Sequence, residues 1–267
     1  MGAKLFTSKM KSSVAVPLAA LLLAAGGVAT AEAVELVQPG TLQIVTTGNA
    51  PPLSLTQADG TITGFDVELC REMARRLDLE PVVSRLEFSA ILPGLAAGRY
   101  DIVCSSTART AARLESPDIT MSDPTIENFT SLVVRTDSGI DSVENVSGLR
   151  IGVVRGGQEK QAVELYYGDK NTTVEYPGLS EEILDLKNKR IDAVAANAVV
   201  AGYYVADDAD IKVITPGLVV EGMSPYYLGL IVNAKAPELG AKVNELLAEM
   251  HADGSFDALA KQWVALD

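Results

Sequence analysis

The chain has 267 residues, of which 48% are hydrophobic and 21% charged, a composition typical of globular proteins and enough for two lobes. Its formal net charge of −13 argues against nucleic acid and anionic membrane surfaces as partners. The one histidine, His251, lies near the end of a charged helical stretch. We therefore expect no Ser-His-Asp triad, no histidine-rich metal site and no cofactor.

Residues 1–33 have the pattern of a secretory signal peptide. Lys4, Lys9 and Lys11 precede an apolar run over 14–29, and A-x-A cleavage options follow at 29–31 and 31–33. The run is shorter than the roughly 20 residues that span a bilayer, and no cysteine follows it for lipid attachment. Removing three lysines and one glutamate lowers the formal charge from −13 to −15. We expect cleavage and a periplasmic mature protein.

From residue 42 onward, short β-rich runs alternate with helical ones, which is the rhythm of a mostly parallel sheet covered by helices. The first cycle predicts a strand at 42–46, a hairpin at 53–63, a helix from 64, a strand at 81–86, a helix at 89–97 and a strand at 101–104. Apolar residues in the helix from 64 keep i, i+3, i+4 spacing, as an amphipathic helix requires.

A second cycle of the same kind follows. It predicts strands at 149–154, 172–175 and 192–196, with helices ending near 166, at 180–189 and from 197. Extended segments at 131–136 and 225–233, and closing helices at 236–252 and 255–264, complete the chain. Two crossings between two α/β lobes would form a hinge. We expect lobe one to comprise 38–134 plus 225–267, and lobe two to comprise 135–224.

Two cysteines remain after the signal peptide. Cys70 lies on the apolar face of the helix from 64, and Cys104 ends the strand at 101–104. An oxidising compartment permits a disulfide between them, since a helix that packs on its own sheet could bring them together. Two buried free thiols are the alternative.

Hydroxyl residues and an arginine follow the strand at 101–104. Ser105 and Ser106 begin the polar stretch, Thr110 is a candidate helix N-cap, and Arg113 falls in the first helical turn. Ligands of open α/β sheets bind beyond the carboxyl ends of the strands, and arginine can grip both oxygens of a carboxylate. The pattern therefore predicts a carboxylate site. In the second cycle, Gly156 and Gly157 expose backbone in the same way, although an ordinary turn explains them equally well.

Several stretches taken together resemble the extracellular solute-binding proteins of family 3, the polar amino-acid receptors of ABC importers. They include LQIVTTGNAPPLSL (42–55), GFDVELCREMARRL (64–77), FSAILPGLAAGRYDIV (88–103) and LRIGVVRGG (149–157), in the family's order. The resemblance implies an α/β fold of two lobes, a type II periplasmic binding protein with two mostly parallel sheets. It implies a monomer without catalytic residues that closes on one small ligand and presents the closed form to a membrane permease.

The resemblance also implies a ligand site. Its carboxylate anchor would be Arg113, with Ser105, Ser106 and the amides near Gly157 and Gln158. Phe88 would form an aromatic wall. The full set of implied ligand-binding residues is Thr47, Ala50, Phe88, Ser105, Ser106, Ala108, Arg113, Gly157, Gln158 and Asn197.

The chain departs from the family pattern at four places. Ala50 replaces an aromatic residue, Ala108 replaces a threonine, and Gly-Gly-Gln at 156–158 replaces Gly-Thr-Thr. Asn197 replaces the aspartate that neutralises the ligand's ammonium group. Two readings stay open: either another acid supplies that charge, with candidates Glu127, Glu159 and Glu221, or the ligand has no α-ammonium.

Two other functions are compatible with this sequence. The first is a receptor that feeds a sensor rather than a transporter, which sequence cannot separate from transport. The second is an enzyme of the prephenate or arogenate dehydratase branch, which places a general acid in the second lobe. Asn197 offers no acid at the expected position, so we expect a binding protein rather than an enzyme.

Overall fold

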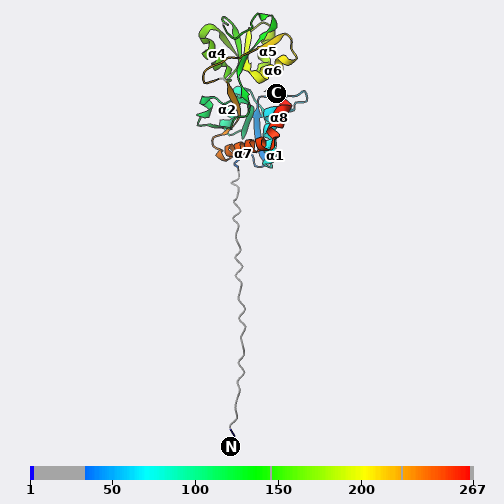
Figure 1. Ribbon diagram of the computed structural model, residues 1–267, viewed down its shortest axis with the longest axis vertical. Coiled ribbons are helices and arrows are strands. Elements are labelled where there is room, and N and C mark those ends of the chain that lie inside the picture. The colour runs from blue at the N-terminus through cyan, green and yellow to red at the C-terminus, as the bar shows by residue number, and fades with distance from the viewer. Residues whose placement is uncertain (3–33, 145, 224, 265–267) are drawn as a thin grey trace. The chain divides into compact units, whose positions relative to one another are not determined.

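The computed structural model describes residues 1–2, 34–144, 146–223 and 225–264. The predicted signal peptide lies outside this range except for its first two residues. In the described part of the chain, two large sheets are each covered by helices, and the sheets define two lobes (Figure 1). No helix among these residues is long and apolar enough to cross a membrane.

The first lobe contains a sheet in the order β5-β1-β6-β14-β7, with β8 paired to β14. Strands β1, β5 and β6 run parallel, and β14 runs antiparallel to β6 and β7. A small sheet of β2, β3 and β4 follows β1. The bounds are β1 (Thr41–Thr46), β2 (Asn49–Ala50), β3 (Ser54–Thr56), β4 (Ile62–Thr63), β5 (Glu80–Arg85), β6 (Ile102–Ala108), β7 (Ile119–Met121), β8 (Glu127–Asn128) and β14 (Tyr226–Asn233).

The second lobe contains a sheet in the order β11-β10-β12-β9-β13. Strands β10, β11 and β12 are parallel, and β9 is antiparallel to both β12 and β13. The bounds are β9 (Thr130–Arg135), β10 (Arg150–Val154), β11 (Thr172–Tyr176), β12 (Ala193–Asn197) and β13 (Ile211–Ile214).

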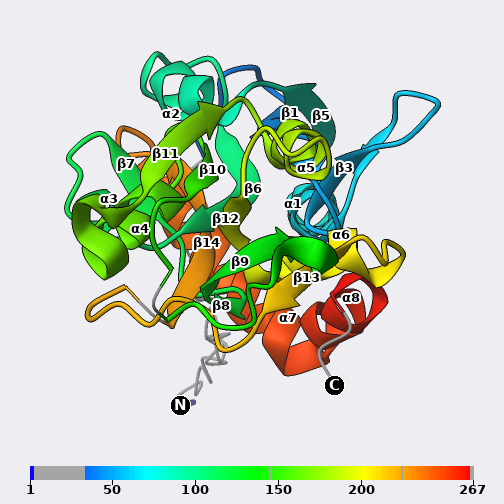
Figure 2. The ribbon, with the colours of Figure 1, turned by 90° about the horizontal axis from the view of Figure 1, so that it is seen from above.

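Helices cover each sheet, as Figures 1 and 2 show. α1, α2 and α7 contact strands of the first sheet, while α4, α5 and α6 contact strands of the second. The bounds are α1 (Phe65–Arg76), α2 (Phe88–Ala96), α3 (Ala111–Leu114), α4 (Glu159–Tyr167), α5 (Leu179–Lys187), α6 (Ala198–Ala206), α7 (Pro237–Asp253) and α8 (Ser255–Trp263), with 3-10 turns η1 (Thr136–Ser138) and η2 (Gly168–Lys170).

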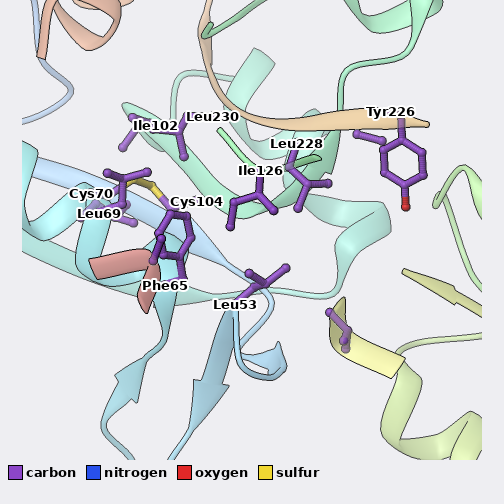
Figure 3. Packing of buried hydrophobic residues seen from close by; sticks show 14 of the residues in the cluster. Leu53, Phe65, Leu69, Cys70, Ile102, Cys104, Ile126, Tyr226, Leu228 and Leu230 are labelled. Atoms are coloured by element: carbon purple, nitrogen blue, oxygen red, sulfur yellow. A yellow bond between two sulfur atoms is a disulfide. The ribbon is translucent and has the colours of Figure 1, made fainter. Parts of the chain in front are cut away.

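Helix α1 connects the core of the first lobe to the strand that ends at the site. Phe65, Leu69 and Met73 are spaced four residues apart and are buried, which accounts for the helix as an amphipathic one. Cys70 on the same helix forms a disulfide with Cys104 of β6, which is the first of the two alternatives that the sequence left open (Figure 3). The bond holds α1 against β6 inside the buried cluster.

The chain passes from the first sheet to the second between β8 and β9, and returns between β13 and β14. Strand pairing assigns residues 130–134 to the second sheet, whereas the sequence analysis gave them to lobe one. An apolar run predicts a strand, but it carries no information about which sheet the strand joins.

Strand β6 is longer than the strand expected at 101–104. The strand continues through Ser105 and Ser106, where the pairing register shifts, to Thr107 and Ala108, which pair with Gly229 and Leu228 of β14. Polar residues at the end of a strand suggest a loop in the sequence. A partner strand on one side can nevertheless form hydrogen bonds with their backbone N–H and C=O groups. The site residues on this segment are therefore held by a sheet rather than by a loop.

Candidate functional site

One pocket is lined by residues of both lobes, and all of the ligand-binding residues implied by the resemblance lie on it. From the first lobe these are Thr47, Ala50, Phe88, Ser105, Ser106, Ala108 and Arg113; from the second lobe they are Gly157, Gln158 and Asn197. Glu159, named from the sequence as a candidate acid, also lines the pocket. The remaining lining residues were not predicted; they are Asn49, Val154, Pro177, Gly178, Leu179, Ala195, Ala196, Val200 and Tyr226.

Arg113 joins the two lobes at this pocket. Thr110 caps α3 by accepting a hydrogen bond from the Arg113 amide at 3.4 Å, as the sequence predicted. The guanidinium donates through Nη1 to the Ala108 carbonyl at 2.9 Å and through Nη2 across the pocket to the Gly156 carbonyl at 3.3 Å. Its Cζ lies 5.6 Å from the centroid of the Phe88 ring, within the range of a cation–π contact. Burial lowers the pKa of this guanidinium from its usual value.

Ser105 is hydrogen-bonded within its own lobe. Its Oγ accepts from the Thr47 amide at 3.1 Å and donates to the Thr47 hydroxyl at 3.3 Å. The Thr47 hydroxyl also lies 3.2 Å from the Ser54 hydroxyl. This buried chain of hydroxyls fixes the ends of β1 and β6 relative to one another, so its first role is to shape the pocket floor.

Ser106 is held by Asp66 of α1. The Asp66 carboxylate accepts from the Ser106 amide at 2.5 Å and from its hydroxyl at 2.9 Å. Ser106 has φ 46°, in the left-handed region that residues other than glycine rarely adopt. Because its amide and hydroxyl protons both go to Asp66, Ser106 can offer a ligand an accepting oxygen but not these donors. Burial raises the pKa of Asp66 to about 6, against the opposing effect of the two Ser106 bonds.

The turn before α4 forms the second-lobe side. The Gly157 amide donates to the Val154 carbonyl at 3.0 Å, so it closes a turn rather than pointing at a ligand. Gln158 is buried and donates through Nε2 to the Thr130 hydroxyl at 3.3 Å. Its Oε1 is buried and has no hydrogen-bond partner among the described residues.

Asn197 is the N-cap of α6. Its Oδ1 accepts from the amides of Val199 at 3.0 Å and Val200 at 3.3 Å. The same oxygen accepts from the side-chain amide of Asn128 at 2.5 Å. These bonds fix which side of the Asn197 amide is the oxygen, since backbone amides can only donate.

Among the three acids considered from the sequence, only Glu159 lines the pocket. Glu127 is exposed and accepts a hydrogen bond from the Tyr227 hydroxyl at 3.1 Å, and Glu221 is exposed. Burial raises the pKa of Glu159, while its own backbone amide and the Arg113 charge act to lower it. An acid at the first position of a helix is readily explained by the helix dipole, which is why its sequence position alone gave no stronger signal.

Tyr226 is one of the pocket residues that were not predicted from the sequence. It begins β14, directly after the second crossing, and its ring is buried. Burial and the nearby Glu159 charge raise the pKa of its hydroxyl. The doubled tyrosine at 226–227 could have indicated one buried and one exposed ring on a strand, but not that the buried ring faces a ligand pocket.

The pocket's charges are balanced. Among its lining residues only Arg113 and Glu159 carry formal charge, and they attract one another without coming within 4.0 Å. No group of three or more His, Cys, Asp or Glu residues in the described chain could hold a metal ion. The site can therefore grip a small polar molecule by one positive and one negative side chain.

Comparison with known proteins agrees with this architecture. A family model described as "Bacterial extracellular solute-binding proteins, family 3" matches residues 42–265. The ABC transporter arginine-binding protein 1 of Escherichia coli (strain K12) is 26% identical over 213 residues, which cover 80% of this chain and 86% of that protein. The histidine-binding periplasmic protein of the same strain is 28% identical over 234 residues, covering 86% of this chain and 89% of that protein.

A solved structure of an ancestral arginine-binding protein bound to arginine superposes with a TM-score of 0.75 and 30% identity, over 84% of this chain and 98% of that one. The residues matched by the family model, 42–265, include both lobes and the two crossings between them. This chain belongs to the bacterial extracellular solute-binding proteins of family 3.

Proposed function

We propose that this protein is the periplasmic binding component of an ABC importer and that it closes its two lobes on a small carboxylate-bearing ligand, with amino acids as the leading class. The observation that carries the proposal is Arg113, which lines the pocket from the first lobe and donates to Gly156 of the second. The relatives named for arginine and histidine binding support amino acids as the class.

The position of Arg113 between the lobes explains how a ligand would close them. Arg113 keeps N–H groups beyond the two that bond Ala108 and Gly156, and a ligand carboxylate can accept from them. A ligand that touches both lobes binds the closed form better than the open form and shifts the equilibrium toward closure. The membrane permease then recognises the closed form. We propose export through the cleaved signal peptide, a monomeric mature protein, and no role for nucleic acid, in keeping with the strong negative charge.

Replacing Arg113 tests the anchor. In Arg113→Met, all guanidinium donors are lost, so affinity for a bound amino acid is expected to fall about 100-fold or more. Arg113→Lys keeps the positive charge but cannot donate two parallel hydrogen bonds to a carboxylate. Its affinity should therefore lie between those of Arg113→Met and the wild type. Titration calorimetry and ligand-induced thermal stabilisation measure both effects.

The matched control is Arg155→Met, which removes an exposed arginine near the same turn whose partner is Glu175 and which does not line the pocket. It should bind as the wild type does. Full stabilisation of Arg113→Met by the same amino acid would show that the carboxylate binds elsewhere.

A dehydratase is the second candidate, and Glu159 is the observation that favours it. A partly buried carboxyl group with a raised pKa can donate a proton, and the second lobe supplies it to a pocket that also holds Arg113. We propose binding rather than catalysis because the family consists of binding proteins. Incubating the purified protein with prephenate separates the two, since only the dehydratase consumes it.

A further inference from the structure

Asn197 does not offer the pocket an acceptor. A carbonyl oxygen has two lone pairs, and Oδ1 of Asn197 already faces three donors from Asn128, Val199 and Val200. The polar atom left to it is Nδ2, which can only donate. A positively charged nitrogen on a ligand is also a donor, so it would meet a donor at Asn197. The amide cannot replace a carboxylate as the receptor of a ligand's cation.

Glu159 occupies a space that Gly157 leaves for it. A Cβ at residue 157 would collide with Oε2 of Glu159 and would lie 3.0 Å from the Val154 carbonyl oxygen. The backbone of Gly157 is not in the left-handed region, so glycine is required here for space and not for conformation. The side chain of Glu159 therefore folds back over the turn at the pocket wall instead of extending away from α4.

Next to this carboxylate lies a second acceptor. The buried Oε1 of Gln158 has no partner among the described residues, although Nε2 of the same amide donates to Thr130. A buried acceptor left without a donor is unfavourable, and a bound N–H group would satisfy it. Gln158 and Glu159 thus present two acceptors, one of them charged, at consecutive positions of the pocket wall.

The charge balance of the pocket excludes a simple anion as the best ligand. A monoanion on Arg113 would neutralise the guanidinium and leave the partly buried Glu159 carboxylate beside a second negative charge, which is unfavourable where solvent screening is reduced. A molecule with one negative and one positive group compensates both side chains. On the proposed function, we infer that the pocket takes a zwitterion whose carboxylate lies on Arg113 and whose cationic nitrogen is bound by Glu159 and Gln158, not by Asn197.

Titration of Glu159 gives the binding preference a pH dependence. The groups that face it are Arg113 from α3, Tyr226 from β14 and Glu182 from α5. Burial raises the pKa of Glu159, so lowering the pH protonates it before an exposed glutamate would be. Protonation removes the charge that binds the cation. The preference for zwitterions over matched anions is expected to shrink as the pH falls.

The experiment measures that preference directly. Wild-type protein is titrated at pH 7.5 with each of the twenty proteinogenic amino acids. Every amino acid that binds is then compared with its deaminated carboxylic acid and its decarboxylated amine. Wild type should bind the zwitterion about 10- to 100-fold more tightly than either analogue. For arginine, citrulline joins the series, because it shows whether the cation on Glu159 is the α-ammonium or the side chain.

In Glu159→Gln, the zwitterion should lose about 10- to 100-fold in affinity while the deaminated acid loses little or gains. Glu221→Gln, which removes an exposed acid outside the pocket, is the matched control and should leave every affinity unchanged. If Glu159→Gln does not fold, the wild-type preference at pH 5 against pH 7.5 gives the same information.

The outcomes separate the inference from the function on which it rests. Equal wild-type binding of an amino acid and its deaminated acid, or an unchanged preference in Glu159→Gln, overturns the inference and leaves carboxylate binding intact. Failure of the wild type to bind any amino acid or any deaminated acid overturns the proposed ligand class itself.

Discussion

At the level of single residues, Asp66 positions Ser106 in the pocket. It lies behind the pocket, 2% exposed, and its carboxylate accepts both protons that Ser106 could otherwise point toward a ligand. The pair holds Ser106 at a positive φ, a conformation that costs about 1 kcal/mol or more for residues other than glycine. The strain is maintained by a buried charge that never touches the pocket, since Asp66 is not among the lining residues.

In Asp66→Asn, stability and affinity should change in opposite directions. Burial raises the folded-state pKa of Asp66 from 3.8 to about 6, so the ionised group destabilises the fold. That loss of stability develops as the pH rises from about 3.8 through about 6 and is complete at neutral pH. The neutral amide avoids it, and the variant should therefore melt at least as high as wild type at pH 7.

The same variant should bind amino acids about tenfold more weakly, because Ser106 loses a charged acceptor. Melting curves and calorimetric titrations on one preparation measure the two quantities. Asp66 affects zwitterions and deaminated acids alike, which distinguishes its pH effect from that of Glu159. A variant that lost stability at pH 7 and kept wild-type affinity would contradict the role given to Asp66.

At the level of helices and strands, the contact between α5 and β10 contains a buried carboxyl group without a hydrogen-bond partner among the described residues. Glu182 is 0% exposed, both of its oxygens lack hydrogen-bond partners in the described chain, and burial raises its pKa well above 4.5. Its Cγ lies 3.3 Å from where a Cβ on Gly152 would be, so the side chain packs directly on the strand. The helix is therefore attached to its sheet by the methylene groups of an acid.

Glu182→Gln should raise the stability of the second lobe at pH 7. The folded-state pKa lies above the unfolded one, so folding with an ionisable Glu182 becomes less favourable as the pH rises from about 4.5 toward the folded value. Removing the ionisation should add roughly 1–3 kcal/mol at pH 7 and much less at pH 5. Denaturant unfolding at the two pH values measures the difference. Glu144→Gln, an exposed acid of the same lobe that does not act on Glu182, is the control. A gain independent of pH would show that ionisation is not the cause.

Most elements could be predicted from the sequence because their apolar periodicity is local. Helix α1 and strands β1, β10 and β14 all lie within a few residues of the expected ranges. The strands that were missed include β7 and β13, which are three and four residues long and lie at sheet edges, and the two-residue strands β2 and β8. Strands this short contain too few residues to show a periodic pattern of apolar side chains.

The residue pattern itself pointed to Ser105, Ser106 and Arg113, and the resemblance supplied the other candidate site residues. Arg113 and Phe88 could be named as site residues. Which donors and acceptors a side chain has left for a ligand depends on the hydrogen bonds that it already makes within the protein. That Ser106 donates to Asp66, and that the Asn197 oxygen also accepts from Asn128, depends on contacts across 40 and 69 residues of sequence. Glu159 and Tyr226 come together from different lobes, and no spacing rule connects them.

For the molecule as a whole, the two lobes touch directly at the pocket rim. Gly178, the residue before α5, faces Asn49 of β2, and a Cβ at 178 would collide with the Asn49 side-chain amide. The backbone of Gly178 is extended, with φ −169°, so any residue can adopt it. Glycine at this position therefore serves the approach of the lobes and not the local fold.

Gly178→Ala should weaken ligand binding without unfolding either lobe. The added methyl group obstructs the closed form alone, so the closed population falls and the apparent affinity falls with it, by about tenfold for a clash of roughly 1.4 kcal/mol. Gly202→Ala is the matched control, because the same methyl group added on α6 meets no atom within 4 Å. Small-angle scattering should show that saturating ligand compacts the control as it does wild type. The Gly178 variant should need more ligand for the same compaction, whereas equal ligand requirements would mean that the lobes do not approach one another at this point on closure.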